Sequence, residues 1–152
     1  MQSLTFCASL LVVATSFANF AHAVDAPEIK AKVALKASVS WDGTPYKPYP
    51  EGQPQLTILE ITIPPHTALP WHHHPVPNAA YVVSGELTIQ DRLTGTSHKV
   101  TAGQAFAESV GASHRGVTGD QAVVVIVTYS GVEGTSLSVP DKGEKAEFEH
   151  VE

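Results

Sequence analysis

Residues 66–85 read HTALPWHHHPVPNAAYVVSG and place three histidines in a row, His72, His73 and His74. Side chains alternate along an extended chain, so we expect His72 and His74 on one face and His73 on the other. Two imidazoles on one strand face can share a metal ion. His114 lies forty residues after His74 and ahead of another strand, where a third imidazole would complete a facial set. The cluster alone leaves a second interpretation equally open, a solvated loop that binds metal weakly.

The sequence around this cluster favours strands. Charged residues make up 16% of the chain and hydrophobic residues 43%, as in a compact globular domain. Eleven glycines and eleven prolines indicate many turns. Short apolar or alternating segments separated by these turns predict a sandwich or closed barrel. The predicted strands are residues 37–41, 56–63, 81–83, 86–90, 98–101, 104–108 and 122–129.

The N-terminus is typical of an export signal. Residues 1–24 contain no Asp, Glu, Lys or Arg, and Ala21-His22-Ala23 supplies small residues for cleavage. Cleavage after Ala23 would remove Cys7, the only cysteine, so the chemistry of the mature protein would depend on nitrogen and oxygen groups. We therefore expect a periplasmic or secreted protein with no stable membrane span after cleavage. The alternative is a retained membrane anchor.

Three further segments follow this predicted signal peptide of residues 1–23. Residues 24–54 are expected to form an N-terminal strand and a proline-rich arm, because four prolines between residues 42 and 54 exclude a helix. Residues 55–140 would form the barrel. Residues 141–152 would form an acidic, frayed C-terminal tail.

Between residues 56 and 129 the chain resembles the cupin superfamily. The first motif of that family is Gly, five residues, His-x-His, three or four residues, Glu, six residues, Gly. The same intervals here join His66, His72, His74, Asn78 and Gly85. The second motif is Gly, five residues, Pro-x-Gly, two residues, His, three residues, Asn. Its intervals here join Gly103, Ser109-Val110-Gly111, His114 and Thr118.

The resemblance implies an all-β, cupin-type double-stranded β-helix, or jelly-roll barrel, as a single domain. It also implies one divalent transition-metal ion held by His72, His74 and His114. Asn78 stands where the family has a carboxylate ligand, and its neutral carbonyl is a weaker donor. Either the site has three histidine ligands with Asn78 marginal, or another group completes it. Three imidazoles suit Fe, Zn, Cu or Ni, and Mn less well.

Two residues are weak catalytic candidates. Glu108 could orient a ligand histidine or act as a general base, although a solvent-facing glutamate is the more common case. Tyr81 could donate a hydrogen bond into the cavity. The resemblance favours a metal-dependent dioxygenase, isomerase or decarboxylase acting on a small molecule, with a non-catalytic binder of metal or a small ligand as the alternative. It also implies a homodimer. The net charge of −6 argues against a nucleic-acid partner.

Overall fold

The structure is a computed structural model that describes residues 28–148. Among these, the residues from Lys32 onward belong to one compact unit. The described residues form no α-helix and nine strands: β1 (Pro54–Ile63), β2 (His72–His73), β3 (Asn78–Ser84), β4 (Glu86–Asp91), β5 (Ser97–Thr101), β6 (Ala105–Ala107), β7 (His114–Thr118), β8 (Val123–Val132) and β9 (Val139–Pro140).

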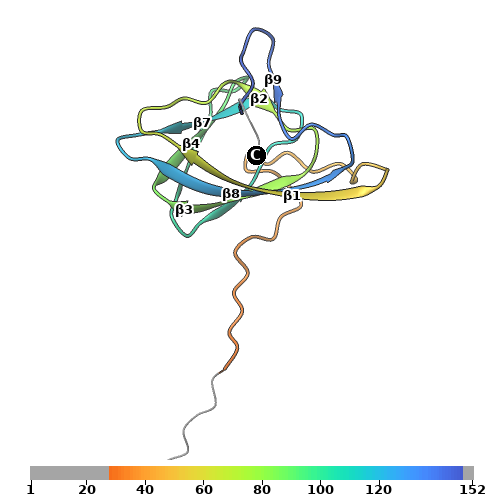
Figure 1. Cartoon of the computed structure of the whole chain (residues 1–152). Coiled ribbons are helices and arrows are strands. Elements are labelled where there is room, and N and C mark those ends of the chain that lie inside the picture. Colours follow the sequence, from red (N-terminus) through yellow and green to blue (C-terminus); the bar gives the residue numbers. More distant parts are fainter. Residues whose placement is uncertain (1–27, 149–152) are drawn as a thin grey trace, which may run out of the picture. The chain divides into compact units, whose positions relative to one another are not determined.

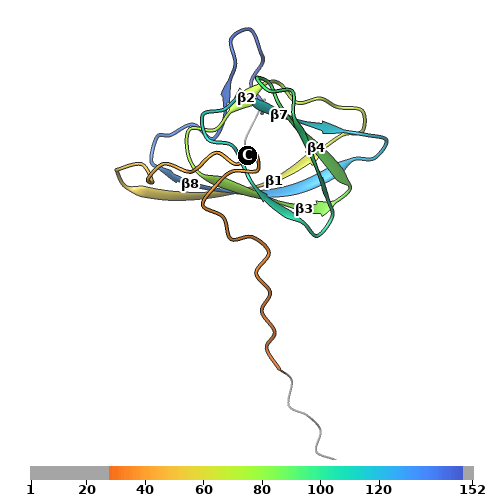
Figure 2. The same ribbon diagram turned by 180° about the vertical axis from the view of Figure 1, so that it is seen from behind.

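The strands form two antiparallel sheets that enclose the core. One sheet has the order β1-β8-β3-β6 and the other the order β5-β4-β7-β2-β9. The sheets face one another, with β1, β3 and β8 in one and β2, β4 and β7 in the other (Figure 1). The same two layers are seen from behind in Figure 2. The predicted all-β jelly-roll domain is confirmed. The core between the sheets includes Val82, Leu87, Ile89, Val100, Phe106, Val125 and Val127.

Strand β8 shows how the sequence forms one wall of this core. Val123, Val125, Val127 and Tyr129 are buried, while the residues between them are only half-buried. Because side chains alternate along a strand, this pattern turns every second residue inward. Pairing with β1 in the register Ile61↔Val125 places apolar residues of both strands on the same inner face. The sheet therefore presents an apolar wall to the space between the two layers.

The expected strand at residues 37–41 is wrong. The structure has one isolated bridge there, between Val39 and Pro45. The carboxylate of Asp42 accepts a hydrogen bond from the backbone N–H of Thr44 at 2.8 Å and another from the Ser40 hydroxyl. These bonds close a tight turn, which ends the extended run before it can pair over several residues.

The described residues, 28–148, include no helix long and apolar enough to span a membrane. The predicted signal peptide, residues 1–23, lies outside them.

Candidate metal centre

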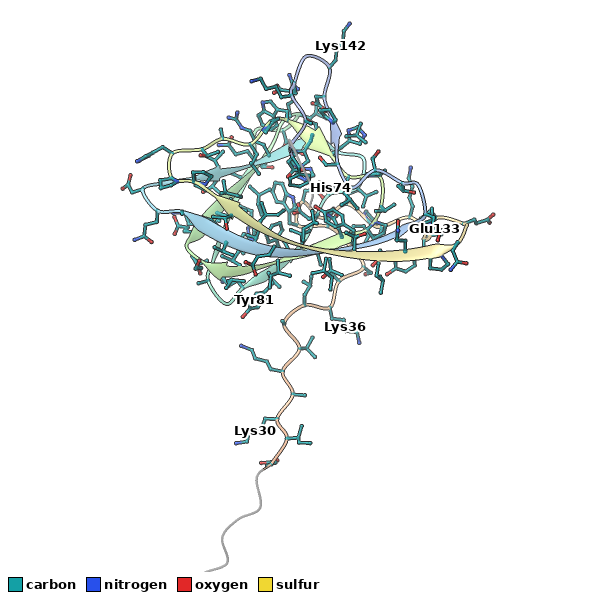
Figure 3. The ribbon with its side chains drawn as sticks, in the orientation of Figure 1. Lys30, Lys36, His74, Tyr81, Glu133 and Lys142 are labelled. Carbon is teal, nitrogen blue, oxygen red and sulfur yellow. The ribbon has the colours of Figure 1, made fainter. Side chains whose placement is uncertain are left out.

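Three buried histidines meet between the two sheets. His72 and His74 are buried and His73 between them is half-exposed, which is the alternation expected from an extended chain. His114 begins β7 and is the direct cross-strand partner of His72. One ring nitrogen from each of the three lies within 4.8 Å of the others. Figure 3 shows His74 pointing into the space between the sheets. The structure thus brings together the three histidines predicted from the sequence.

Each of these rings is held by a backbone carbonyl. Each Nδ1 atom donates a hydrogen bond of 2.8 Å to a backbone carbonyl oxygen. The acceptors are Pro70 for His72, Leu137 for His74 and Ala112 for His114. A carbonyl oxygen can only accept a hydrogen bond, so the proton of each neutral ring is on Nδ1. The lone pair is then on Nε2. Hydrogen bonds of this kind are what fixes metal-binding histidines in proteins.

Two carboxylates lie beside the imidazoles. Oε2 of Glu108, just after β6, is 3.3 Å from Nε2 of His114. Oε2 of Glu147 is 3.4 Å from Nε2 of His72. Glu108 therefore reaches the cavity, as the sequence analysis considered, and is not a solvent-facing residue. Its carbonyl oxygen accepts a 2.7 Å hydrogen bond from the hydroxyl of Tyr46, which anchors this end of β6 to the N-terminal arm.

Glu147 is the site residue that the sequence analysis missed. It belongs to the segment expected to fray, yet its side chain is only 6% exposed. The tail is charged and has no periodic pattern that would predict burial. The single available signal is Phe148, the one aromatic residue of Phe, Trp or Tyr type after residue 140, directly beside Glu147. Residues 149–152 of the predicted tail lie outside the described residues.

The cavity between these groups is small and mostly apolar. Its volume of about 30 Å³ has room for a metal ion or a water molecule and not for an organic substrate. Its lining comprises the three histidines, the two glutamates and Ile61, Ile63, Leu69, Ala80, Leu87, Ile89, Phe106, Gly116, Val125, Val127 and Tyr129.

Burial and neighbouring charges set the protonation of the site. Burial, with the adjacent His74 and His114 rings, lowers the pKa of His72 to about 4. Burial also lowers the pKa of His74. For His114 burial acts in the same direction, but the Glu108 carboxylate outweighs it and raises the pKa of the ring. Despite burial, His114 keeps the pKa of Glu108 low. Burial raises the pKa of Glu147 to about 7.

The donor atoms fit a divalent transition-metal ion. Nε2 of His114 and Oε2 of Glu147 are buried and have no hydrogen-bond partner. A buried polar atom without a partner costs free energy, and a cation among the rings would provide a partner for Nε2 of His114. Three imidazole nitrogens with carboxylate oxygens nearby form a donor set that Fe, Zn, Cu and Ni accept. The residues present therefore suit the metal that the motif spacing implies.

The remaining predicted residues are more distant from this centre. Asn78, at the start of β3, is buried, and neither polar atom of its side chain has a hydrogen-bond partner, but it is not among the residues lining the cavity. The interpretation of Tyr81 as a cavity donor is wrong. Its side chain is 39% exposed and points away from the interior in Figure 3, because Ala80 and Val82 occupy the inward positions of β3. His66 is an exposed turn residue with a positive φ of 53°.

Comparisons with known proteins agree with this fold. A cupin domain family model matches residues 59–129. The DMSP lyase DddQ from Ruegeria pomeroyi DSS-3 superposes with a TM-score of 0.51 at 19% identity, covering 64% of this chain and 46% of the lyase. A cupin-like protein from Thermotoga maritima MSB8 gives a TM-score of 0.50 at 17% identity. The superposition covers 57% of this chain and 64% of the Thermotoga protein.

A chain from a study of the DMSP lyases RdDddP and RnDddQII gives a TM-score of 0.51 at 20% identity, with 57% of this chain and 44% of the other covered. This chain thus spans less than half the length of either lyase. No curated protein matches its sequence. At such identities the likeness shows the fold alone. The family match and the two facing antiparallel sheets together show that residues 59–129 of this chain form a cupin domain.

Proposed function

We propose that this protein binds one divalent transition-metal ion through Nε2 of His72, His74 and His114, and that it acts on a small molecule outside the cytoplasm. One observation carries the proposal: all three Nδ1 atoms are bonded to backbone carbonyls, so three lone pairs converge on one small cavity. Fe, Zn, Cu and Ni fit this donor set, and Mn fits it less well.

A bound metal would supply Lewis acidity, and O₂ chemistry if it is iron or copper. The chain's own residues would contribute a water-poor site and a proton acceptor. Apolar side chains such as Phe106 and Val127 form most of the wall and limit the access of water. Glu108 could take up a proton at Oε2, 3.3 Å from Nε2 of His114. These features are compatible with the dioxygenase, isomerase or decarboxylase that the cupin resemblance implies.

A non-catalytic binder of metal or a small ligand is the second candidate, and one observation favours it. With Glu147 in place, the cavity of about 30 Å³ cannot admit an organic substrate beside an ion. Closed metal sites are typical of structural or storage roles, whereas catalytic sites keep an open coordination position. The enzyme reading therefore requires Glu147 to move when substrate enters.

Elemental analysis of protein matured in its native compartment tests the metal, and turnover tests the reaction. We expect one equivalent of Fe, Zn, Cu or Ni per chain, and none in a variant with all three histidines replaced by alanine. O₂ uptake or product formation by the metal-loaded protein with catechols, flavonoids or keto acids would support an enzyme. Stoichiometric binding without turnover would support the binder. Native protein without a metal would overturn the proposal.

We also propose export to the periplasm or secretion, and assembly as a homodimer. The first rests on the N-terminal signal pattern and is tested by sequencing the N-terminus of the mature protein. The second is supported by β1, a ten-residue strand at the edge of its sheet, where Leu56 and Ile58 are 74% and 67% exposed. Exposed apolar edges are usually covered.

Light scattering tests the dimer. Leu56→Glu combined with Ile58→Glu should convert it to a monomer, because two charges would be buried in the interface. Leu93→Glu provides the control, since Leu93 is even more exposed, at 94%, but lies in the turn after β4. A monomeric wild-type protein would contradict the assembly.

A further inference from the structure

Glu147 reaches the histidines from a segment that is anchored some residues earlier. After β9 the carboxylate of Asp141 accepts hydrogen bonds from Arg92 and from the Ser113 hydroxyl, each at 2.6 Å. The backbone N–H of Asp141 donates to the oxygen of Trp71 at 2.9 Å. Trp71 and Ser113 are the residues immediately before His72 and His114. The start of the tail is therefore fixed beside two of the three imidazoles.

The Glu147 carboxylate has no lysine or arginine beside it in the cavity. Its side chain is 6% exposed, Oε2 has no hydrogen-bond partner, and no Lys or Arg is among the described residues that line the cavity. A buried carboxylate oxygen without a partner is unfavourable, because its hydration is lost. Oε2 lies 3.4 Å from Nε2 of His72, the atom that carries the lone pair of the neutral ring. An ion bound at Nε2 of His72 would place a positive charge close to Oε2.

The barrel itself offers a weaker oxygen donor at the expected position. Asn78 occupies the place of the carboxylate in the first histidine motif and does not line the cavity. Glu147 comes from the opposite end of the domain sequence, outside both motifs. It brings a negatively charged oxygen to the face of the histidine cluster next to His72.

We propose that Glu147 is a carboxylate ligand of the metal, delivered by the C-terminal segment 141–148, so that metal binding docks this segment over the cavity. The inference rests on the proposed metal site of the three histidines. Glu108 belongs to the barrel, where its backbone bonds Asn78 and Tyr46. Glu147 instead lies after the last strand, β9, and its departure would open the coordination position that a small molecule needs.

Metal titration of the full chain tests the ligand role without any activity measurement. We would compare wild type, Glu147→Gln and Glu147→Ala with Glu144→Gln, which makes the same chemical change in the same segment outside the cavity lining. Competition with a chromophoric chelator should show Zn²⁺ affinity about tenfold or more weaker in both Glu147 variants. The Co²⁺ absorption spectrum should change with them, because the ion loses a carboxylate. Glu144→Gln should match wild type in both measurements.

Limited proteolysis tests the docking of the segment. Lys142 and Lys145 are exposed, so trypsin can cleave beside Glu147. Zn²⁺ should slow cleavage at Lys145 several-fold in wild type and in Glu144→Gln, and should have no effect in Glu147→Ala. The inference alone would be overturned if wild type binds metal through the three histidines but the Glu147 variants match it in metal affinity, Co²⁺ spectrum and the effect of Zn²⁺ on cleavage. Wild type that binds no metal would overturn the proposed function as well.

Discussion

His72 and His114 lie directly opposite one another across β2 and β7, with ring centroids 4.8 Å apart. The ring centroid of His74 is 5.0 Å from the centroid of each of these two rings. The pairing of β2 with β7 thus fixes two of the rings, and the alternation along the extended chain just after β2 places the third. The convergence depends on backbone pairing rather than on flexible side chains, which is how a preorganised site is usually built.

Replacing any one of the three histidines by alanine should remove most of the metal affinity. Each substitution deletes one of three nitrogen donors, so we expect a loss of at least about 100-fold. His73→Ala is the matched control, because His73 belongs to the same run but is half-exposed on the other face. Isothermal titration with Zn²⁺ measures the effect. Affinities unchanged in the three variants, or lowered equally by His73→Ala, would contradict the assignment of the site.

Metal should stabilise the folded protein. A ligand that binds only the native state adds about 2.7 kcal/mol at a free concentration of 100 times its Kd. For a domain of this size that corresponds to a rise in Tm of about 10 °C. Differential scanning calorimetry with Zn²⁺ and then with excess EDTA would show the rise and its reversal. In His114→Ala, whose affinity should be at least about 100-fold weaker, the same addition should raise Tm by no more than about 2 °C.

The N-terminal arm should contribute to stability through Asp42. Its Oδ2 accepts a 2.9 Å hydrogen bond from the hydroxyl of Ser109, which is fully buried at the start of the loop leading to His114. Asp42→Ala would leave this hydroxyl without a partner and should lower the free energy of unfolding by about 2 kcal/mol. Asp120→Ala is the control, since that side chain is 96% exposed. Urea denaturation compares the two, and equal effects would argue against the role of Asp42.

The histidine cluster could be predicted from the sequence for two reasons. A local period of two places His72 and His74 on one face, and the resemblance to the cupin motifs adds the distant His114. Tyr81 was assigned wrongly because the neighbouring residues are apolar on both faces of β3, so composition does not tell which face is inward. The structure shows that Ala80 and Val82 are buried.

Glu147 could not be predicted by this reasoning. Its contact with His72 joins residues at opposite ends of the barrel sequence, and no strand period or motif interval connects them. Such a contact arises only when β9 has paired with β2 and Asp141 has fixed the tail beside Trp71. A charged tail also suggests solvent exposure, because burying a carboxylate is costly without a partner. Its burial became intelligible only with the three imidazoles beside it.

Glu147→Gln should stabilise the metal-free protein, and increasingly so as the pH rises. Burial raises the pKa of Glu147 in the folded state to about 7, from an ordinary value of 4.5. The unfolded chain therefore loses this proton at lower pH than the folded chain does. The folded state is penalised progressively as the pH rises from 4.5 to 7, and the penalty is complete above pH 7, at about 3 kcal/mol as an upper estimate. Glutamine cannot ionise and escapes this penalty.

Urea denaturation of EDTA-treated proteins on both sides of this pH range measures the difference. The free energy of unfolding that Glu147→Gln gains over wild type should be small below pH 4.5 and largest above pH 7. Glu144→Gln should show no such trend. The protonation of His72 and the other shared groups largely cancels in this comparison. Saturating Zn²⁺ should reverse the order above pH 7, because the ionised carboxylate then faces a cation. A stability difference that is independent of pH would mean that the Glu147 carboxylate is not held in the cavity.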